Sequence, residues 1–253
     1  MPTSFTHTTL GSTGLNVHRL GLAATYFPGK KTIYRAVDAG LNYFFAFGVD
    51  YVLATGAYNF VWGYQNLRRT LEKRLRQFRT DVIDVFLFLG VTREKEFPEP
   101  ALEEMMKFRE EGKVRAIGMT CHDRPFAGRM ASRGALDGLM IRYNAAHRGA
   151  EVDIFPYLLF HNPGVVSYTA TRWHALLERP KGWPQNRPIP DAGMVYRFVL
   201  SNPHVHVCLT APTNMVQFEE NLASLSRGPL SSDEASFMRE FGDAVHRQRR
   251  WFM

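Results

Sequence analysis

The stretch "NLRRTLEKRLRQFRTDVIDVFLFLGV", residues 66–91, joins an amphipathic helix to a buried strand and decides the fold class. In its first half Leu67, Leu71 and Leu75 recur four residues apart, which gives a basic helix one apolar face. Its second half is a continuous apolar run, typical of a strand that is covered on both faces in a parallel sheet. The stretch therefore predicts one helix–strand unit of an α/β protein.

The same unit recurs on both sides of this stretch. Amphipathic helical patterns alternate with short apolar runs along most of the chain, as in repeated βα units around a parallel sheet. Predicted helices cover residues 32–39, 66–78, 101–111, 124–132, 152–160, 192–201, 217–225 and 231–250. Predicted strands cover residues 19–23, 42–47, 51–55, 81–91, 114–120, 138–143, 164–169 and 205–210. Short runs around residues 11–14 predict a hairpin before the first unit.

One junction conflicts with a regular parallel sheet. The predicted strands 42–47 and 51–55 are separated only by Gly48, Val49 and Asp50. Parallel neighbours usually need a crossover of about a dozen residues. We therefore expect that the sheet is incomplete or remodelled around its second and third strands, or that a piece of the natural chain is missing there.

Composition indicates one globular domain, residues 1–253, with 45% hydrophobic residues to build its core. The formal charge is +7, but Lys and Arg are interleaved with Glu, as on solvated helix faces, so we expect no nucleic-acid partner. No segment reaches the apolar length of a membrane span, and the N-terminus has no apolar signal region. We expect a soluble cytoplasmic protein with a small-molecule ligand; the oligomeric state is not indicated.

The two cysteines, Cys121 and Cys208, both lie in apolar strand-like runs. No pair of Cys or His residues has the spacing of a metal site, so we predict no bound metal. Reduced thiols inside a cytoplasmic protein fit this pattern.

Several stretches together resemble the aldo-keto reductase superfamily. They are "LGSTGLNVHRLGLAA" (10–24), "AVDAGLNYF" (36–44), residues 66–88, "EEGKVRAIGMTCH" (110–122), "RYNAAHR" (142–148) and "RFVLSNPHVHVCLTAPTNMVQFEENL" (197–222). They follow one another in the order of that family along nearly the whole chain. The resemblance implies a (β/α)8 TIM barrel that binds NADPH and reduces carbonyl groups.

The resemblance also implies a catalytic tetrad of Asp, Tyr, Lys and His, and this sequence departs from it at every position. Phe45 stands in the place of the Asp, Gly56 in the place of the Lys, and Leu89 or Gly90 in the place of the His. The Tyr has no counterpart, since Tyr51 begins the next predicted strand. A general acid, its tuning cation and both supporting groups are therefore absent together, which predicts that ordinary carbonyl reduction is lost.

The implied NADP site is only partly retained. Residues 211–213 read Ala-Pro-Thr, where the family has Gly, a small residue and a cation for the adenosine phosphate. Three residues match the family at the cofactor, namely Tyr168 under the nicotinamide ring and Glu220 and Asn221 at the adenine. A solvated helix start explains Glu220 and Asn221 equally well, so the sequence gives NADP binding little support.

The remaining polar residues at predicted strand ends supply candidates for a different chemistry. His122 is the candidate for proton transfer, with Tyr143 and Arg172 to orient a substrate or neutralise its charge. A structural interpretation is open as well, because His122 and Asp123 could cap the following helix. Cys121 beside His122 is better explained as a buried, inert thiol, since adjacent strand residues point to opposite faces.

The sequence thus predicts an aldo-keto-reductase-like barrel with a degenerate active site. The leading hypothesis is a non-redox enzyme that catalyses cyclisation, isomerisation or elimination of a small organic molecule. One alternative is a catalytically inactive pseudoenzyme that binds or regulates. A second alternative is a divergent NADPH-dependent oxidoreductase.

Overall fold

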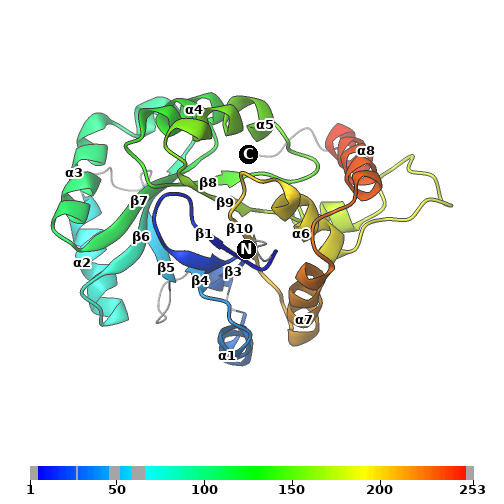
Figure 1. Ribbon diagram of the computed structural model, residues 1–253, viewed down its shortest axis with the longest axis horizontal. Helices are drawn as coiled ribbons and strands as arrows, with labels where there is room; N and C mark the ends of the chain where they lie inside the picture. Colours follow the sequence, from blue (N-terminus) through cyan, green and yellow to red (C-terminus); the bar gives the residue numbers. More distant parts are fainter. Residues whose placement is uncertain (1–4, 27, 46–51, 59–65, 249–253) are drawn as a thin grey trace.

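The computed structural model describes residues 5–26, 28–45, 52–58 and 66–248. Eight parallel strands close into a barrel in the order β10-β3-β4-β5-β6-β7-β8-β9 (Figure 1). The strands are β3 (Leu20–Ala23), β4 (Tyr43–Phe45), β5 (Val52–Tyr58), β6 (Ile83–Val91), β7 (Val114–Cys121), β8 (Gly138–Arg142), β9 (Gly164–Tyr168) and β10 (Val207–Thr210). The predicted α/β fold and the TIM-barrel type are confirmed.

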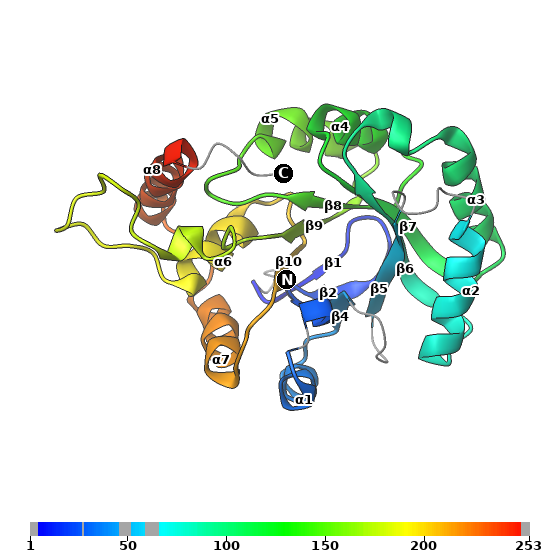
Figure 2. The ribbon, with the colours of Figure 1, turned by 180° about the vertical axis from the view of Figure 1, so that it is seen from behind.

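Helices cover the outside of the barrel, as the two opposite views show (Figures 1 and 2). They are α1 (Lys30–Asp38), α2 (Leu67–Phe78), α3 (Glu99–Glu110), α4 (Arg124–Arg133), α5 (Ala150–Asp153), α6 (Ala192–Ser201), α7 (Met215–Ser224) and α8 (Ser232–Gln248). Side chains of Asp123, Asp191 and Asn214 accept backbone N–H bonds at the starts of α4, α6 and α7. No helix in the described part of the chain is long and apolar enough to cross a membrane.

The predicted hairpin is present and lies against one end of the barrel. Its strands β1 (His7–Thr9) and β2 (Asn16–His18) pair antiparallel. Leu10 and Val17 pack into the apolar cluster of the barrel interior, and Leu10 contacts the position where β9 begins. The hairpin therefore covers the N-terminal ends of the strands, opposite the end where barrel proteins carry their sites.

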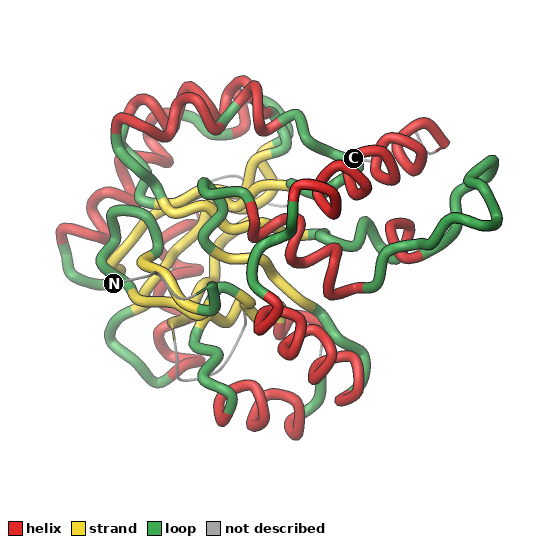
Figure 3. Tube along the Cα trace, turned by 45° about the vertical axis from the view of Figure 1, so that its right-hand side comes forward, coloured by secondary structure: helices red, strands yellow, loops and turns green. Residues whose placement is uncertain are grey.

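The prediction of one helix over residues 152–160 is wrong. α5 ends at Asp153, and residues Phe155–Phe160 form a 3-10 helix, η4. Pro156 explains the break: it has no N–H to donate, and its ring disfavours a helical conformation of the residue before it. A long Pro- and Gly-rich loop, residues 178–191, extends away from the barrel between η5 (Ala175–Leu177) and α6 (Figure 3).

The barrel is closed at its second and third strands, so the expectation of an incomplete sheet is wrong. β4 and β5 pair in parallel, with Tyr43 opposite Val52 and Phe45 opposite Ala54. From Phe45 back to the level of Val52 the chain returns only about 7 Å along the strand, which six residues can span. Those connecting residues, 46–51, lie outside the described part, as do the predicted strand end at Phe47 and start at Tyr51. β5 also runs to Tyr58, three residues beyond its predicted end.

Candidate functional site

A cavity of about 690 Å³ opens at the C-terminal ends of the strands. Every strand of the barrel contributes to its wall, with Ala23, Phe45, Tyr58, Leu89, Thr120, Met140, Tyr168 and Leu209. The rest of the wall comes from Tyr26 after β3, Gly90 on β6, His122 after β7, the segment after β9, helix α6, and the stretch from the end of β10 into α7. This is the end of a TIM barrel at which enzymes of this architecture carry their active sites.

Strand alternation explains which side chains reach the cavity. On β4, Tyr43 lies in the barrel interior, Phe44 packs outward against the helices, and Phe45 reaches the cavity. On β6 the register shifts between Phe88 and Val91, and the Gly90 N–H donates to the Thr120 hydroxyl at 2.6 Å. Bulges of this kind re-aim side chains beside functional sites.

His122 and Tyr168 form the central polar pair of the wall. His122 follows β7, and Tyr168 ends β9. The Tyr168 hydroxyl lies 3.3 Å from Nδ1 and 3.4 Å from Nε2 of His122, and the rings meet edge-on with their centroids 5.9 Å apart. These are long hydrogen-bond distances, so the contact orients the imidazole only weakly.

Burial adjusts the protonation of both groups. It lowers the pKa of His122 below the usual 6.5, and nearby Arg142 lowers it further. Burial raises the pKa of the Tyr168 phenol well above its usual 10. At neutral pH the pair therefore consists of a neutral imidazole, which can accept a proton, and a protonated phenol, which can donate a hydrogen bond.

The structure does not bring Tyr143 to this pair. The Tyr143 hydroxyl donates to Glu151 at 2.7 Å and accepts from the Asn202 amide at 3.2 Å. Its ring packs against Phe155 and Phe198 in the outer core. The placement of Tyr143 beside His122 is therefore corrected, and its contacts are those of a structural residue.

Arg172 also lies away from the cavity wall. Its side chain is only 1% exposed and donates from Nη1 to the carbonyl oxygen of Val245 in α8 at 2.8 Å. Arg172, Trp173 and His174 all have positive φ angles, between 50° and 68°. This left-handed turn directs Arg172 toward α8, whereas Trp173 and His174 line the cavity. The sequence predicts Arg172 at the site instead of Trp173 and His174, because nothing in these three non-glycine residues indicates positive φ.

The three residues predicted at the cofactor do share one cavity. Tyr168, Glu220 and Asn221 all line it. Asn221 is buried, and its amide donates to the Thr210 hydroxyl at 3.0 Å, which in turn donates to the Tyr196 hydroxyl at 3.0 Å. Asn221 thus supports the wall, while Glu220 is exposed at α7.

The described lining does not fit NADP(H) at the phosphates. It contains no Lys or Arg, and its single formally charged side chain, Glu220, would repel them. Thr213 stands where the family has a cation, and both its N–H and its hydroxyl are bonded to Gln217 Oε1 at 2.9 Å. No group of His, Cys, Asp and Glu in the described residues could hold a metal ion.

Gly56 stands where the resemblance places the catalytic Lys, and the structure leaves no room for a side chain there. A Cβ atom on Gly56 would lie 2.0 Å from the Leu87 carbonyl oxygen and 2.9 Å from the Leu89 side chain. Phe45, where the resemblance implies the Asp, and Leu89 and Gly90, the two residues where it could place the His, all line the cavity. Strands β5 and β6 therefore approach more closely than any residue with a Cβ would allow.

The cysteines take no part in the site. Cys121 is buried, and its thiol donates to the Asp123 carbonyl oxygen at 3.1 Å. Burial raises the pKa of this thiol to about 12, so it stays protonated. Asp123 itself caps α4 through its bond to the Phe126 N–H. Each of the residues 121–123 therefore has its own place: Cys121 is an inert thiol, His122 lines the cavity, and Asp123 caps a helix.

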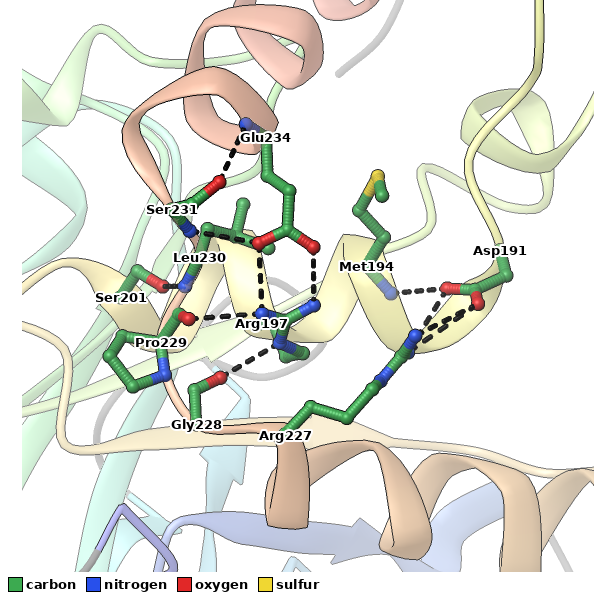
Figure 4. Close-up of polar contacts among 10 residues, drawn as sticks. All are labelled: Asp191, Met194, Arg197, Ser201, Arg227, Gly228, Pro229, Leu230, Ser231 and Glu234. Carbon is green, nitrogen blue, oxygen red and sulfur yellow. Dashed lines mark hydrogen bonds and ion pairs between the residues drawn. The ribbon is translucent and has the colours of Figure 1, made fainter.

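A buried arginine holds the cavity-lining helix α6 in place (Figure 4). Arg197 follows the lining residue Tyr196 and donates to the carbonyl oxygens of Gly228 and Pro229 and to both carboxylate oxygens of Glu234, at 2.8–3.0 Å. Its side chain is almost fully buried. These bonds tie α6 to the segment after α7 and to the start of α8.

Comparison with known proteins identifies the fold. Neither a protein-family model nor a curated protein sequence matches the chain. The holo form of an aldo-keto reductase from Bacillus halodurans matches it with a TM-score of 0.77 and 18% identity, over 97% of this chain and 99% of that chain. The apo form matches with a TM-score of 0.75, at the same identity and coverage. The chain therefore has the (β/α)8-barrel fold of the aldo-keto reductases.

Proposed function

We propose that this protein is a redox-neutral enzyme that moves a proton on a small organic molecule in the barrel cavity. The observation that carries the proposal is the pairing of a neutral His122 with a protonated Tyr168 on the cavity wall. Such a pair suits isomerisation, cyclisation or elimination, in which a C–H proton is removed and charge develops on an oxygen.

In this mechanism His122 accepts the proton and becomes an imidazolium. Electron density moves from the broken C–H bond into the substrate, and Tyr168 donates a hydrogen bond to the oxygen on which negative charge develops. In an isomerisation His122 returns its proton at a second carbon. In an elimination the proton passes to solvent after the leaving group departs. No electron is taken up or released overall.

Two features argue against carbonyl reduction as the activity. Phe45, Gly56 and Leu89 offer no proton donor, cation or supporting imidazole at the positions where the resemblance expects them. The described lining also lacks the cation that an NADP phosphate would need. We therefore infer that NADP is not the working cofactor, and no step of the mechanism depends on it.

The ring opening of 5-nitrobenzisoxazole tests the proposal. A base removes the C3 proton, the N–O bond breaks, and a coloured cyanonitrophenolate forms without any redox partner. We expect His122→Ala to lower kcat/KM by about 100-fold, the scale of general base catalysis. His161→Ala, an exposed histidine outside the cavity lining, should leave the rate unchanged. Equal rates for wild type and His122→Ala would contradict the proposal and favour a binding protein.

A further inference from the structure

Among the described residues, the cavity wall combines many aromatic rings with a single formal charge. Its aromatic residues are Tyr26, Phe45, Tyr58, Tyr168, Trp173 and Tyr196. The one carboxylate is Glu220, and the described lining has neither Lys nor Arg. Aromatic faces carry negative electrostatic potential, so rings and carboxylate together favour a cation over an anion.

The barrel topology brings three of these residues into neighbouring sectors of the rim. β10 pairs with β9 on one side and with β3 on the other. Trp173 follows β9, Glu220 lies on the helix after β10, and Tyr26 ends the 3-10 helix η1 (Ala24–Tyr26) after β3. The carboxylate sector therefore lies between two sectors that each contribute an aromatic residue to the same cavity.

The aromatic residues of this rim remain accessible. Tyr26 is 68% exposed and Trp173 is 59% exposed, although both line the cavity. Large rings at such exposure are poorly used as packing residues and are well placed to meet a ligand. Tyr196 closes the same region from α6 and is buried.

The backbone that presents Trp173 is strained and firmly anchored. Three consecutive non-glycine residues, Arg172, Trp173 and His174, have positive φ. The Leu176 N–H donates to the Thr171 carbonyl oxygen at 3.1 Å, and buried Arg172 is bonded to α8. Positive φ at such residues costs free energy and persists where surrounding contacts impose it, often at ligand sites.

The charge distribution gives the cavity a direction. Arg142, at the end of β8, acts electrostatically on both His122 and Tyr168, so positive potential lies beside this pair. The exposed rings of Trp173 and Tyr26 lie in the sectors after β9 and β3, and Glu220 lies between them in the sector after β10. A ligand with a cationic group in that sector would extend its uncharged, reacting part toward His122.

We propose that the substrate is an organic cation, a quaternary or protonated amine, whose charged group binds between Tyr26, Trp173 and Glu220. This inference rests on the proposed function, since it names the substrate class of the same cavity. Burying a cation against aromatic faces provides selectivity over an uncharged group of the same shape. It also accounts for a cavity whose lining repels phosphates.

Binding of choline tests the inference against its uncharged isostere 3,3-dimethylbutan-1-ol, with ligand methyl signals followed by NMR. We expect choline to bind about tenfold more tightly. Glu220→Gln and Trp173→Leu should each weaken choline at least about threefold while changing the isostere little. Glu219→Gln is the matched control, because that neighbouring carboxylate pairs with Arg35 and is outside the cavity lining.

The outcomes separate this inference from the proposed function. Equal binding of choline and the isostere, or no detectable binding of either, overturns the cation subsite. Loss of choline binding in Glu219→Gln as large as in Glu220→Gln also overturns it, since the effect would then be one of net charge. Choline binding by His122→Ala should match that of wild type. The cation subsite is therefore tested by choline binding, and the proton-transfer proposal is tested by the His122-dependent rate.

Discussion

The Tyr168 hydroxyl lies within 3.4 Å of both ring nitrogens of His122, across two strands that are not adjacent in the barrel. β8 separates their strands, so the two side chains meet over the inside of the barrel and not within the sheet. The contact joins a residue predicted for proton transfer to one predicted for cofactor stacking, and the proposed function rests on it.

The pH dependence of the proton-transfer rate should follow His122. Only the neutral imidazole accepts a proton, and its pKa is lowered from 6.5 by burial and then by Arg142. We therefore expect kcat/KM for 5-nitrobenzisoxazole to fall with acid, with the midpoint of this acid limb below pH 6.5. Arg142→Gln should move this acid limb to higher pH, because it removes the positive charge that lowers the pKa of His122. Arg115→Gln, which removes an exposed charge near the start of β7, should not move it. An acid limb unchanged by Arg142→Gln would contradict the assignment.

Removing one hydroxyl at a time distinguishes the two tyrosines. Tyr168→Phe should lower the elimination rate about tenfold, because it removes the donor to the developing oxyanion. Tyr143→Phe should leave the rate unchanged and reduce the free energy of unfolding by about 1 kcal/mol, because it removes bonds to Glu151 and Asn202. Rate assays and urea unfolding of both variants check this. A rate loss confined to Tyr143→Phe would restore the original placement of that residue at the site.

Gly56 should not tolerate any side chain. Gly56→Ala places a Cβ within 2.0 Å of the Leu87 carbonyl oxygen, and we expect it to destabilise the fold by about 3 kcal/mol. Gly138→Ala is the matched control, because its Cβ would meet its nearest neighbour, the Gly164 carbonyl oxygen, at 3.4 Å. Thermal unfolding measures both. Equal stability of the two variants would show that β5 and β6 can separate to admit a side chain.

Arg197 should contribute far more stability than a surface arginine. Arg197→Met leaves Glu234 and two carbonyl oxygens without their buried partner, which we expect to cost about 3 kcal/mol. Arg187→Met, which breaks an exposed pair with Glu240, should cost far less, because water solvates both charged groups. Urea unfolding compares the two. Similar losses would mean that α6 is held by its apolar packing alone.

Acid should destabilise the fold through His206 among other groups. Burial lowers the pKa of His206 to about 4, while in the unfolded chain it titrates near 6.5. As the pH falls below 6.5, His206 becomes protonated in the unfolded state but stays neutral in the folded state, so the free energy of unfolding declines. His206→Asn should reduce the loss between pH 7 and pH 5 in urea titrations. An unchanged loss would assign the acid sensitivity to other groups.

Much of the fold could be predicted from the sequence, because local signals agreed with tertiary packing. The bounds of α6 follow from the cap at Asp191 and from an apolar run that packs in the core. The predicted helix over residues 152–160 is broken because Pro156 interrupts it, and β5 runs past Thr55 because residues 56–58 continue to pair with β6.

The site was predictable only in part. His122, Tyr168 and Glu220 were found because they stand at strand ends or match the family's order. The positions of Tyr143 and Arg172 could not be predicted. Tyr143 depends on which face of the barrel the end of its strand presents, and Arg172 depends on a left-handed turn. Such features follow from contacts between distant parts of the chain, such as that of Arg172 with α8.

Whether His122 acts as the base is measured by the ratio of kcat/KM between wild type and His122→Ala for 5-nitrobenzisoxazole, without NADPH and again with NADPH added. We expect a ratio of about 100 that does not change with the cofactor. A ratio near one, or activity that appears only with NADPH, would contradict this expectation.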